Sequence, residues 1–305
     1  MDLDLLYFLQ EARVPFVTLL MNGISYLAAE YITVLVICLF YWSLDKKLAY
    51  KISLSFLFGG VLVQGLKIVL KIPRPFVRDS RLFVDKTAES GATGYSFPSG
   101  HTQSATATYA PIGLHFKKKW LAIVMFALIV LIMFSRMYLG CHTIQDVLVS
   151  FAITFAVTLV INIVVDSGEL TLKKNLIIAI SALVLTIAVA VYGFVTVNDE
   201  NIANVMDGFK TAGIATGFVI GWFIEASFIK YDNTKNRKVL NIILKTLVGL
   251  GVALLLQQGP KFAFTRILNT DVNTTVMIPV HIVRYLLCGL WLTAAYPAIL
   301  KKLGK

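Results

Sequence analysis

The sequence predicts an all-helical membrane protein, a polytopic bundle of about nine transmembrane helices. Its mean hydropathy is +0.77 and 57% of its residues are hydrophobic, whereas only 15% are charged. In a soluble domain the charged fraction is about a quarter. Apolar runs recur along all 305 residues, and about twenty such residues let a helix cross the hydrocarbon core. Since lipid offers no hydrogen-bond partner to the backbone, these runs are expected to cross as helices.

The expected spans follow one another with short connections, and no connection is long enough for a separate soluble domain. A helix that is interfacial or re-entrant is expected at residues 14–29, before a short first span. Near-fourfold spacing of glycines in the seventh span, from Gly208 to Gly221, favours close helix packing. The nine spans are expected at residues 30–44, 48–70, 99–116, 120–140, 145–165, 174–197, 208–230, 239–257 and 278–300.

The basic residues indicate an orientation in the membrane and argue against a nucleic-acid partner. The formal charge of +11 comes from clusters in short loops, and in a nine-span arrangement these clusters share one side. Cytoplasmic loops carry such an excess of lysine and arginine, so that side is expected to be cytoplasmic. The exception is the basic loop 71–98, which falls on the external side. The cytoplasmic clusters are Lys46, Lys47 and Lys51; Lys117, Lys118 and Lys119; Lys173 and Lys174; Lys230, Lys235, Arg237 and Lys238; and Lys301, Lys302 and Lys305.

Three groups of polar residues emerge on the expected external face. The first is Lys67 followed after six residues by Arg74-Pro75, and the second is the run PSGH that ends at His101. The third begins at Ser135-Arg136 and continues, with fixed spacing, to His142 and Asp146. Ionisable groups at the edge of a membrane are costly, and for that reason they usually serve a function.

The residue types in these groups suit a phosphate ligand. Lys67, Arg74 and Arg136 supply three cations, and arginine adds a planar fork for bidentate phosphate contacts. Ser99 and Gly100 fall at the expected N-terminus of the third span, where free N–H groups favour an anion. Gly100 has no side chain, so a phosphate oxygen can approach the backbone there.

Two histidines of the same groups have a pKa suited to acid–base or nucleophilic chemistry, His101 and His142. Asp146 is four residues after His142, so on a helix the two share a face. The carboxylate can then hold one ring nitrogen protonated, which leaves the other free to attack phosphorus. The external loops contain no group of Asp, Glu and His residues with the number of ligands that magnesium or zinc needs, and Cys38, Cys141 and Cys288 are scattered. We therefore expect neither a metal nor another cofactor.

These motifs closely resemble those of the type-2 phosphatidic-acid phosphatase superfamily, whose members are integral-membrane lipid phosphatases sharing an active site with the vanadium haloperoxidases. The family pattern is K-x6-R-P, then P-S-G-H, then S-R-x5-H-x3-D, and this sequence matches every fixed position between residues 67 and 146. The resemblance implies that His142 is a nucleophile forming a phosphohistidine, that His101 is the general acid and that Asp146 orients His142. Lys67, Arg74, Ser99, Gly100 and Arg136 would bind the substrate phosphate.

The resemblance also predicts how the chain is divided into segments. The span layout extends it to residues 30–197, so we expect an N-terminal interfacial or re-entrant segment (1–29), a phosphatase core (30–200) and additional transmembrane helices (201–305). A six-span core is typical of the family, and the resemblance does not explain the three spans beyond it.

The expected function is removal of a terminal phosphate from a membrane lipid phosphate or diphosphate, at an active site facing outward from the cell membrane. A polyprenyl diphosphate phosphatase of the undecaprenyl type is one specific alternative. Another is a phospholipid phosphotransferase or a transporter on the same frame, which the three extra spans suggest. The His142–Asp146 pair and His101 argue against transport, since transport needs the cations but not these groups. The motifs do not distinguish among lipid tails, and the sequence does not indicate an oligomeric state.

Overall fold

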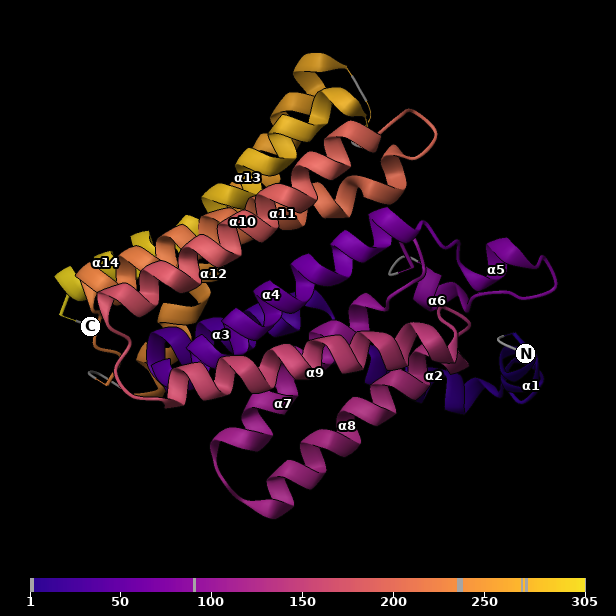
Figure 1. Cartoon of the computed structure of the whole chain (residues 1–305), viewed down its shortest axis with the longest axis horizontal. Helices are drawn as coiled ribbons and strands as arrows, with labels where there is room; N and C mark the ends of the chain where they lie inside the picture. Colours follow the sequence, from indigo (N-terminus) through magenta and orange to yellow (C-terminus); the bar gives the residue numbers. More distant parts are fainter. Residues whose placement is uncertain (1–2, 90–91, 235–237, 270, 272–273, 305) are drawn as a thin grey trace. The chain divides into compact units, whose positions relative to one another are not determined.

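The computed structural model of the chain describes residues 1–305 except 1–2, 90–91, 235–237, 270, 272–273 and 305. This part of the chain is helical and contains no strand (Figure 1), so the predicted all-helical class is confirmed. The elements are α1 (Asp4–Glu11), α2 (Pro15–Tyr26), α3 (Glu30–Ser43), α4 (Lys46–Leu70), α5 (Pro75–Arg78), α6 (Lys86–Glu89), α7 (Gly100–His115), α8 (Lys119–Tyr138), α9 (Ile144–Asp166), α10 (Leu172–Thr196), α11 (Ile202–Ile224), η1 (Glu225–Ile229), α12 (Val239–Leu268), η2 (Thr275–Met277), α13 (Ile278–Leu290), η3 (Trp291–Ala295) and α14 (Tyr296–Lys302).

The count of nine spans is not confirmed. A helix lies at each expected range, but within the described residues only seven are long and apolar enough to cross a membrane. The helices α2 and α3 meet at a bend of 43° and together would make an eighth. The remaining helix, α7, has 16 residues, which gives a length of about 24 Å against a hydrocarbon core of about 30 Å. Because α7 is short and polar, it does not meet the length and hydropathy of a spanning helix. This explains why fewer than nine such helices are found among the described residues.

Contacts divide the chain into two compact units. The first contains Met1–Val36 and Lys51–Ile163, and the second contains Ile37–Tyr50 and Val164–Lys305. All eight residues expected to form the site belong to the first unit.

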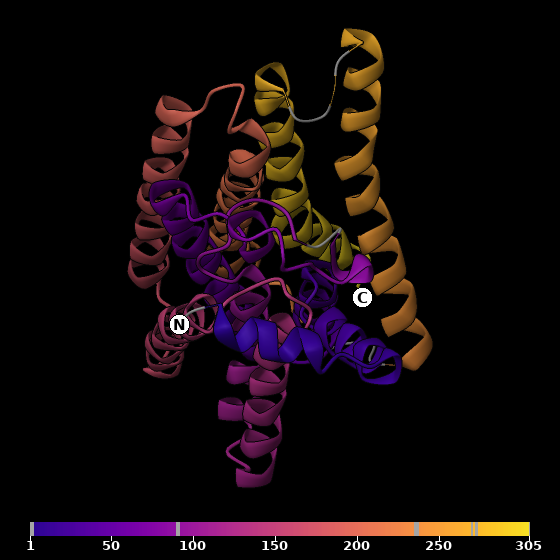
Figure 2. The same cartoon turned by 90° about the vertical axis from the view of Figure 1, so that its right-hand side faces the viewer.

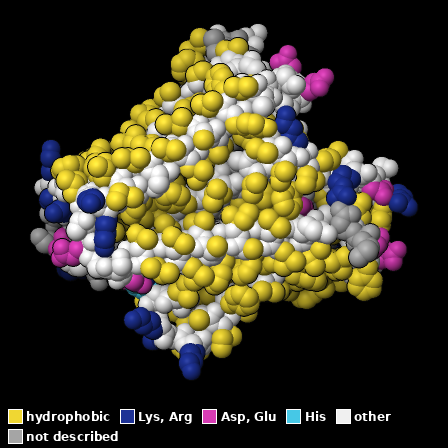
Figure 3. Space-filling view, viewed as in Figure 1, with side chains coloured by type: hydrophobic (Ala, Val, Ile, Leu, Met, Phe, Trp, Pro, Cys, Tyr) yellow, Lys and Arg dark blue, Asp and Glu magenta, His cyan; other side chains and the backbone are white. Residues whose placement is uncertain are grey.

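In the first unit, α7 is buried although it is rich in threonine and serine. Gln103 donates from Nε2 to the carbonyl of Phe56 at 3.0 Å, and Thr108 shares a hydrogen bond of 3.0 Å with Thr33. Apolar residues of the same helix pack with α8 and α9 in a cluster that includes Ala105, Ile129, Ile132 and Val147. Lysines 117–119 are exposed at the turn between α7 and α8, where Figure 3 shows dark-blue side chains below the hydrophobic ones of this helix pair.

In the second unit, α10, α11, α12 and α13 form a bundle (Figure 2), with α11 packed closely on α13. A Cβ added at Gly213 would lie 2.4 Å from the carbonyl oxygen of Ile282, and one added at Gly217 would lie 2.0 Å from that of Leu286. No side chain fits there, so the predicted role of these glycines in close helix packing is confirmed.

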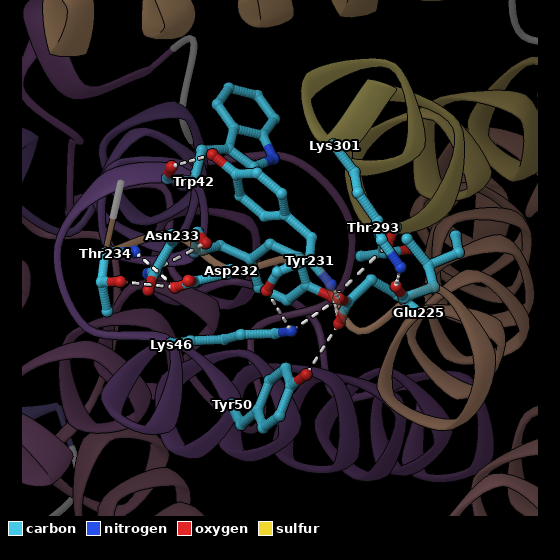
Figure 4. Close-up of polar contacts among 12 residues, drawn as sticks. Trp42, Lys46, Tyr50, Glu225, Tyr231, Asp232, Asn233, Thr234, Thr293 and Lys301 are labelled. Carbon is cyan, nitrogen blue, oxygen red and sulfur yellow. Dashed lines mark hydrogen bonds and ion pairs between the residues drawn. The ribbon is translucent and has the colours of Figure 1, made fainter. Parts of the chain in front are cut away.

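The second unit also encloses a carboxylate that the sequence analysis did not single out. Glu225 is 0% exposed and begins the π-helix η1. Its Oε1 accepts from Nζ of Lys46 at 2.6 Å and from the backbone N–H of Tyr231 at 2.8 Å. Its Oε2 accepts from the hydroxyls of Tyr50 at 2.7 Å and Tyr41 at 3.0 Å. Figure 4 shows Lys46 and Tyr50, from the first turns of α4, pointing toward Glu225 at the end of α11. Four donors therefore satisfy this buried charge, as burial of a carboxylate requires.

Candidate active site

The predicted nucleophile His142 lies just beyond a turn that α8 makes at its C-terminus. Gly140 has a φ of +78°, and its N–H donates to the carbonyl of Met137 while the N–H of Cys141 donates to that of Arg136. This pair of bonds closes a Schellman motif, which needs a left-handed residue and so favours glycine. The turn thus fixes the short path from Arg136 to His142.

Three donor groups lie within hydrogen-bond distance of one carboxylate oxygen of Asp146. Its Oδ2 accepts from the hydroxyl of Ser96 at 2.6 Å and from the backbone N–H of Thr143 at 2.8 Å, and it lies 3.3 Å from Nδ1 of His142. The predicted i,i+4 pairing of His142 and Asp146 is therefore present. The Oγ of Ser96 also lies 3.4 Å from Nδ1 of His142, and Ser96 was not among the expected site residues.

The contact on the other ring nitrogen fixes the tautomer of His142. Nη1 of Arg74 lies 3.0 Å from Nε2, and a guanidinium can only donate. Nε2 is therefore the unprotonated acceptor, and the proton of the neutral imidazole is on Nδ1, facing Asp146. This is the tautomer in which Nε2 carries a lone pair.

Burial lowers the pKa of His142 below its usual range, and the positive charge of Arg74 acts in the same direction, while Asp146 opposes both. The imidazole of a histidine is neutral above its pKa. The lowered pKa therefore keeps His142 neutral at neutral pH and into the mildly acidic range.

Arg74 is held by backbone carbonyls as well as by the histidine. Its Nε donates to the carbonyl of Gly94 at 3.1 Å, its Nη1 to that of Cys141 at 3.2 Å, and its Nη2 to that of Thr93. The loop that follows α6 thus wraps the guanidinium. Lys67, at the end of α4, donates to the carbonyl of Tyr95 in the same loop at 2.5 Å. Both cations are about 95% buried, each with 5% of its surface exposed.

The start of α7 is tied to the start of α9. Ser99 is the N-cap of α7 and accepts from the N–H of Thr102 at 3.4 Å. The N–H of Ser99 donates to the carbonyl of Asp146 at 3.0 Å, and its carbonyl accepts from the hydroxyl of Ser150 at 2.6 Å. A Cβ built on Gly100 meets no atom within 4 Å, so the backbone there borders open space.

His101 occupies the first turn of α7 and is half-buried. It lies close enough to four other site residues to interact with them electrostatically, namely Arg136, His142, Arg74 and Lys67. Arg136 is 2% exposed and donates from Nη1 to the hydroxyl of Ser25 at 2.6 Å. The structure therefore places all eight expected residues in one part of the first unit, where Gly100 and His101 are half-buried and the others are buried. Their chemical roles stay predictions.

Sequence reasoning missed Ser96 and Ser25. Ser96 lies in the sequence GYSFPSG, which has no periodicity to indicate which way a side chain points. Ser25 lies in α2, far from the motifs in sequence. Only the packing of distant segments reveals these two contacts. Among the residues that the structure describes, no group of three or more His, Cys, Asp and Glu side chains is arranged to hold a metal ion.

Two family models match the chain. The model of the PAP2 superfamily matches residues 48–168, and that of the PAP2 superfamily phosphatase transmembrane extension matches residues 209–305. The first match contains all the motif residues. The second covers the spans that the resemblance had left unexplained.

A curated relative agrees with the first match. The chain is 30% identical over 126 residues to the lipid phosphate phosphatase delta of Arabidopsis thaliana. The aligned part is 38% of this chain and 30% of the relative, so the chain spans less than a third of the length of that protein. No solved structure gives a significant match to the chain.

Proposed function

Because the chain belongs to the PAP2 superfamily, we propose that it is an integral-membrane phosphatase that removes the terminal phosphate of a lipid phosphate or diphosphate. The observation that carries this proposal is the placement of the two ring nitrogens of His142, from which its tautomer follows. Its Nδ1–H faces Asp146, and its Nε2 lone pair faces the guanidinium of Arg74. A nucleophilic histidine needs this arrangement, with an oriented and unprotonated nitrogen beside a group that binds phosphate.

In the first step, the N–H of Arg74 turns from Nε2 of His142 to a phosphate oxygen. Nε2 then attacks phosphorus, and the bond from phosphorus to the leaving oxygen breaks. His101 gives its proton to that oxygen, which leaves as an alcohol from a lipid monophosphate or as the shorter lipid phosphate from a diphosphate. The imidazole becomes cationic as the nitrogen–phosphorus bond forms, and the Asp146 carboxylate stabilises that charge. In the second step, water gives a proton to His101 and attacks phosphorus, which releases inorganic phosphate and neutral His142.

Negative charge on the phosphoryl oxygens is met by the cations Lys67, Arg74 and Arg136. The N–H groups at the start of α7, from Gly100 onward, add further donors. Fixed donors of this kind, in a site sheltered from water, are usually the largest contribution to such catalysis. Two nitrogen atoms of Arg136, Nε and Nη2, have no hydrogen-bond partner among the described residues, and phosphate oxygens could accept from them.

The substrate and the side of the membrane are part of the proposal. The basic clusters favour an active site on the external face of the cell membrane, where it would act on lipid phosphates or on polyprenyl diphosphates. The three extra spans had suggested a transferase or transporter. These spans match the transmembrane extension of PAP2 superfamily phosphatases, so a phosphatase also explains their presence. We therefore do not propose a transferase or a transporter.

The test is release of inorganic phosphate by the purified full-length chain in detergent micelles. The panel contains phosphatidic acid, a sphingoid-base phosphate, phosphatidylglycerol phosphate and an undecaprenyl diphosphate. Each assay is run with EDTA and with added magnesium. We expect release from at least one lipid, unchanged by EDTA and abolished by His142→Ala, while the control His115→Ala at the far end of α7 retains activity. Absence of release from every lipid, or release only with magnesium, would refute the proposal.

A further inference from the structure

The cation Arg136 is anchored by a residue outside all three motifs. Its Nη1 donates to Oγ of Ser25 at 2.6 Å, and both side chains are buried, with 2% and 5% of their surface exposed. Its Nε and Nη2 are buried and have no hydrogen-bond partner among the residues that the structure describes. Ser25 therefore holds one corner of the guanidinium and leaves the opposite edge open.

The edge formed by Nε and Nη2 has the shape and charge that suit a phosphate. Nε and Nη2 present their N–H groups side by side, and this planar fork matches two oxygens of a phosphate. Two buried donor nitrogens of a cation without partners are costly, so their presence points to an anionic ligand. A guanidinium held only by its own flexible stem would lose that orientation.

Ser25 is itself well placed to act as an anchor because α2 is tied to its surroundings. The N–H of Val14 donates to the hydroxyl of Tyr138 at 3.1 Å, and Nε of Arg13 donates to the carbonyl of Tyr138 at 2.8 Å. Nδ2 of Asn22 donates to Oδ1 of Asp85 at 3.2 Å. The N-terminal helices are thus fixed to the end of α8, the helix that carries Arg136.

The turn that leads to His142 abuts the same segment. A Cβ added at Gly140 would lie 2.7 Å from Nη2 of Arg13 and 2.7 Å from the carbonyl oxygen of Phe83. Arg13 in turn donates to that carbonyl at 3.0 Å. The N-terminal segment therefore contacts both Arg136 and the turn at Gly140 that leads to His142.

From these contacts we propose that Ser25 is a positioning residue for the active site. It fixes the guanidinium of Arg136 so that Nε and Nη2 face the phosphate of the substrate. The identity of that phosphate rests on the proposed function, whereas the positioning of Arg136 for an anion does not. Residues 1–29, which lie outside the matched phosphatase family model, then complete the phosphate-binding site.

Binding of orthovanadate, a phosphate analogue, tests this role apart from catalysis. Its dissociation constant is measured by thermal stabilisation of the purified full-length chain. Ser25→Ala should weaken binding roughly tenfold, about the value of one hydrogen bond to a charged group. Ser25→Cys, which fills the same space with a weak acceptor, should weaken it similarly, and Ser25→Thr should restore it to within about threefold. Ser55→Ala is the matched control, since Ser55 is buried in α4 and its hydroxyl has no hydrogen-bond partner among the described residues.

A double-mutant cycle shows whether Ser25 acts through Arg136. In an Arg136→Ala background, Ser25→Ala should cause no further loss of vanadate binding. Unchanged binding in Ser25→Ala and Ser25→Cys, a further loss in the Arg136→Ala background, or absence of vanadate binding by the unmodified chain would overturn the proposal.

Hydrolysis of the lipid panel, measured in parallel, separates this proposal from the proposed function. A chain that binds vanadate through Ser25 and Arg136 but releases no phosphate would refute the phosphatase and support the role of Ser25. A chain that hydrolyses a lipid phosphate equally well with and without the Ser25 hydroxyl would do the reverse.

Discussion

Nη1 of Arg74 donates a hydrogen bond to Nε2 of His142 over 3.0 Å. The same guanidinium is held by carbonyls of Gly94, Thr93 and Cys141. Arg74 thus does two things in the proposed reaction. It holds the imidazole in the tautomer with an unprotonated Nε2, and it places a positive charge beside the nitrogen that would attack phosphorus.

Replacing Arg74 by lysine separates charge from shape. Arg74→Lys keeps the positive charge but loses the planar fork that meets several acceptors at once. We expect kcat/KM to fall about 10²–10³-fold, as for loss of one donor that stabilises a transition state. The control is Arg78→Lys, the same change at an exposed residue of α5. A loss of less than threefold in Arg74→Lys would contradict the role assigned to its geometry.

Ser96→Ala tests whether the carboxylate of Asp146 needs its second support. The change removes the 2.6 Å bond to Oδ2 but leaves the backbone N–H of Thr143 in place. A hydrogen bond to a charged group contributes about 1.5–3 kcal/mol, so kcat should fall roughly ten- to a hundredfold. KM should change less, because Ser96 contacts the orienting residue rather than the phosphate. Ser181→Ala, at an exposed position of α10, is the control, and a wild-type kcat in Ser96→Ala would argue against this role.

The leaving group reveals the role of His101. If His101 protonates the departing oxygen, the kcat/KM of His101→Ala for an alkyl phosphate should fall roughly 10²–10⁴-fold. The fall in kcat/KM of this variant should be much smaller with p-nitrophenyl phosphate, because its leaving group needs little protonation. The measurement is the ratio of kcat/KM for the two substrates in the variant and in the unmodified chain. Equal losses for both substrates would remove His101 from the role of general acid.

The buried Glu225–Lys46 pair should matter for stability. Their side chains are 0% and 20% exposed, and loss of one partner of a buried pair costs about 3 kcal/mol or more. Glu225→Ala should therefore lower the apparent unfolding temperature clearly, and Lys46→Met in the same chain should recover part of the loss. Asp166→Ala provides a matched control, because the Asp166–Lys47 pair is about half exposed and such pairs contribute ~1 kcal/mol or less. If Glu225→Ala and Asp166→Ala lower the apparent unfolding temperature by similar amounts, the buried network adds no special stability.

The sequence predicted the helices and the motif residues because each has a local signal. Long apolar runs mark spanning helices, and fixed spacing relates Arg136, His142 and Asp146. The predicted family is confirmed by the family matches. The count of nine spans is not confirmed, and the physical reason is α7, which has 16 residues and is largely buried in protein.

Contacts between segments that are distant in sequence could not be predicted. Ser25 meets Arg136 across 111 positions, and Tyr41 meets Glu225 across 184. Glu225 lies inside an expected apolar span, where nothing in the adjacent sequence indicates that Lys46 and two tyrosines would meet it. Such partners follow from the packing of helices, which hydrophobic periodicity alone does not determine.

The measurement that tests the account most directly is the trapping of the phosphoenzyme. The full-length chain is mixed with a ³²P-labelled lipid phosphate that it hydrolyses, quenched within one turnover in denaturant at alkaline pH, and digested for mass spectrometry. We predict an acid-labile phosphate on the peptide that contains His142, absent in His142→Ala and retained in His115→Ala. Phosphoenzyme formed by His142→Ala, or label found on another residue, would contradict the assignment of His142 as the nucleophile.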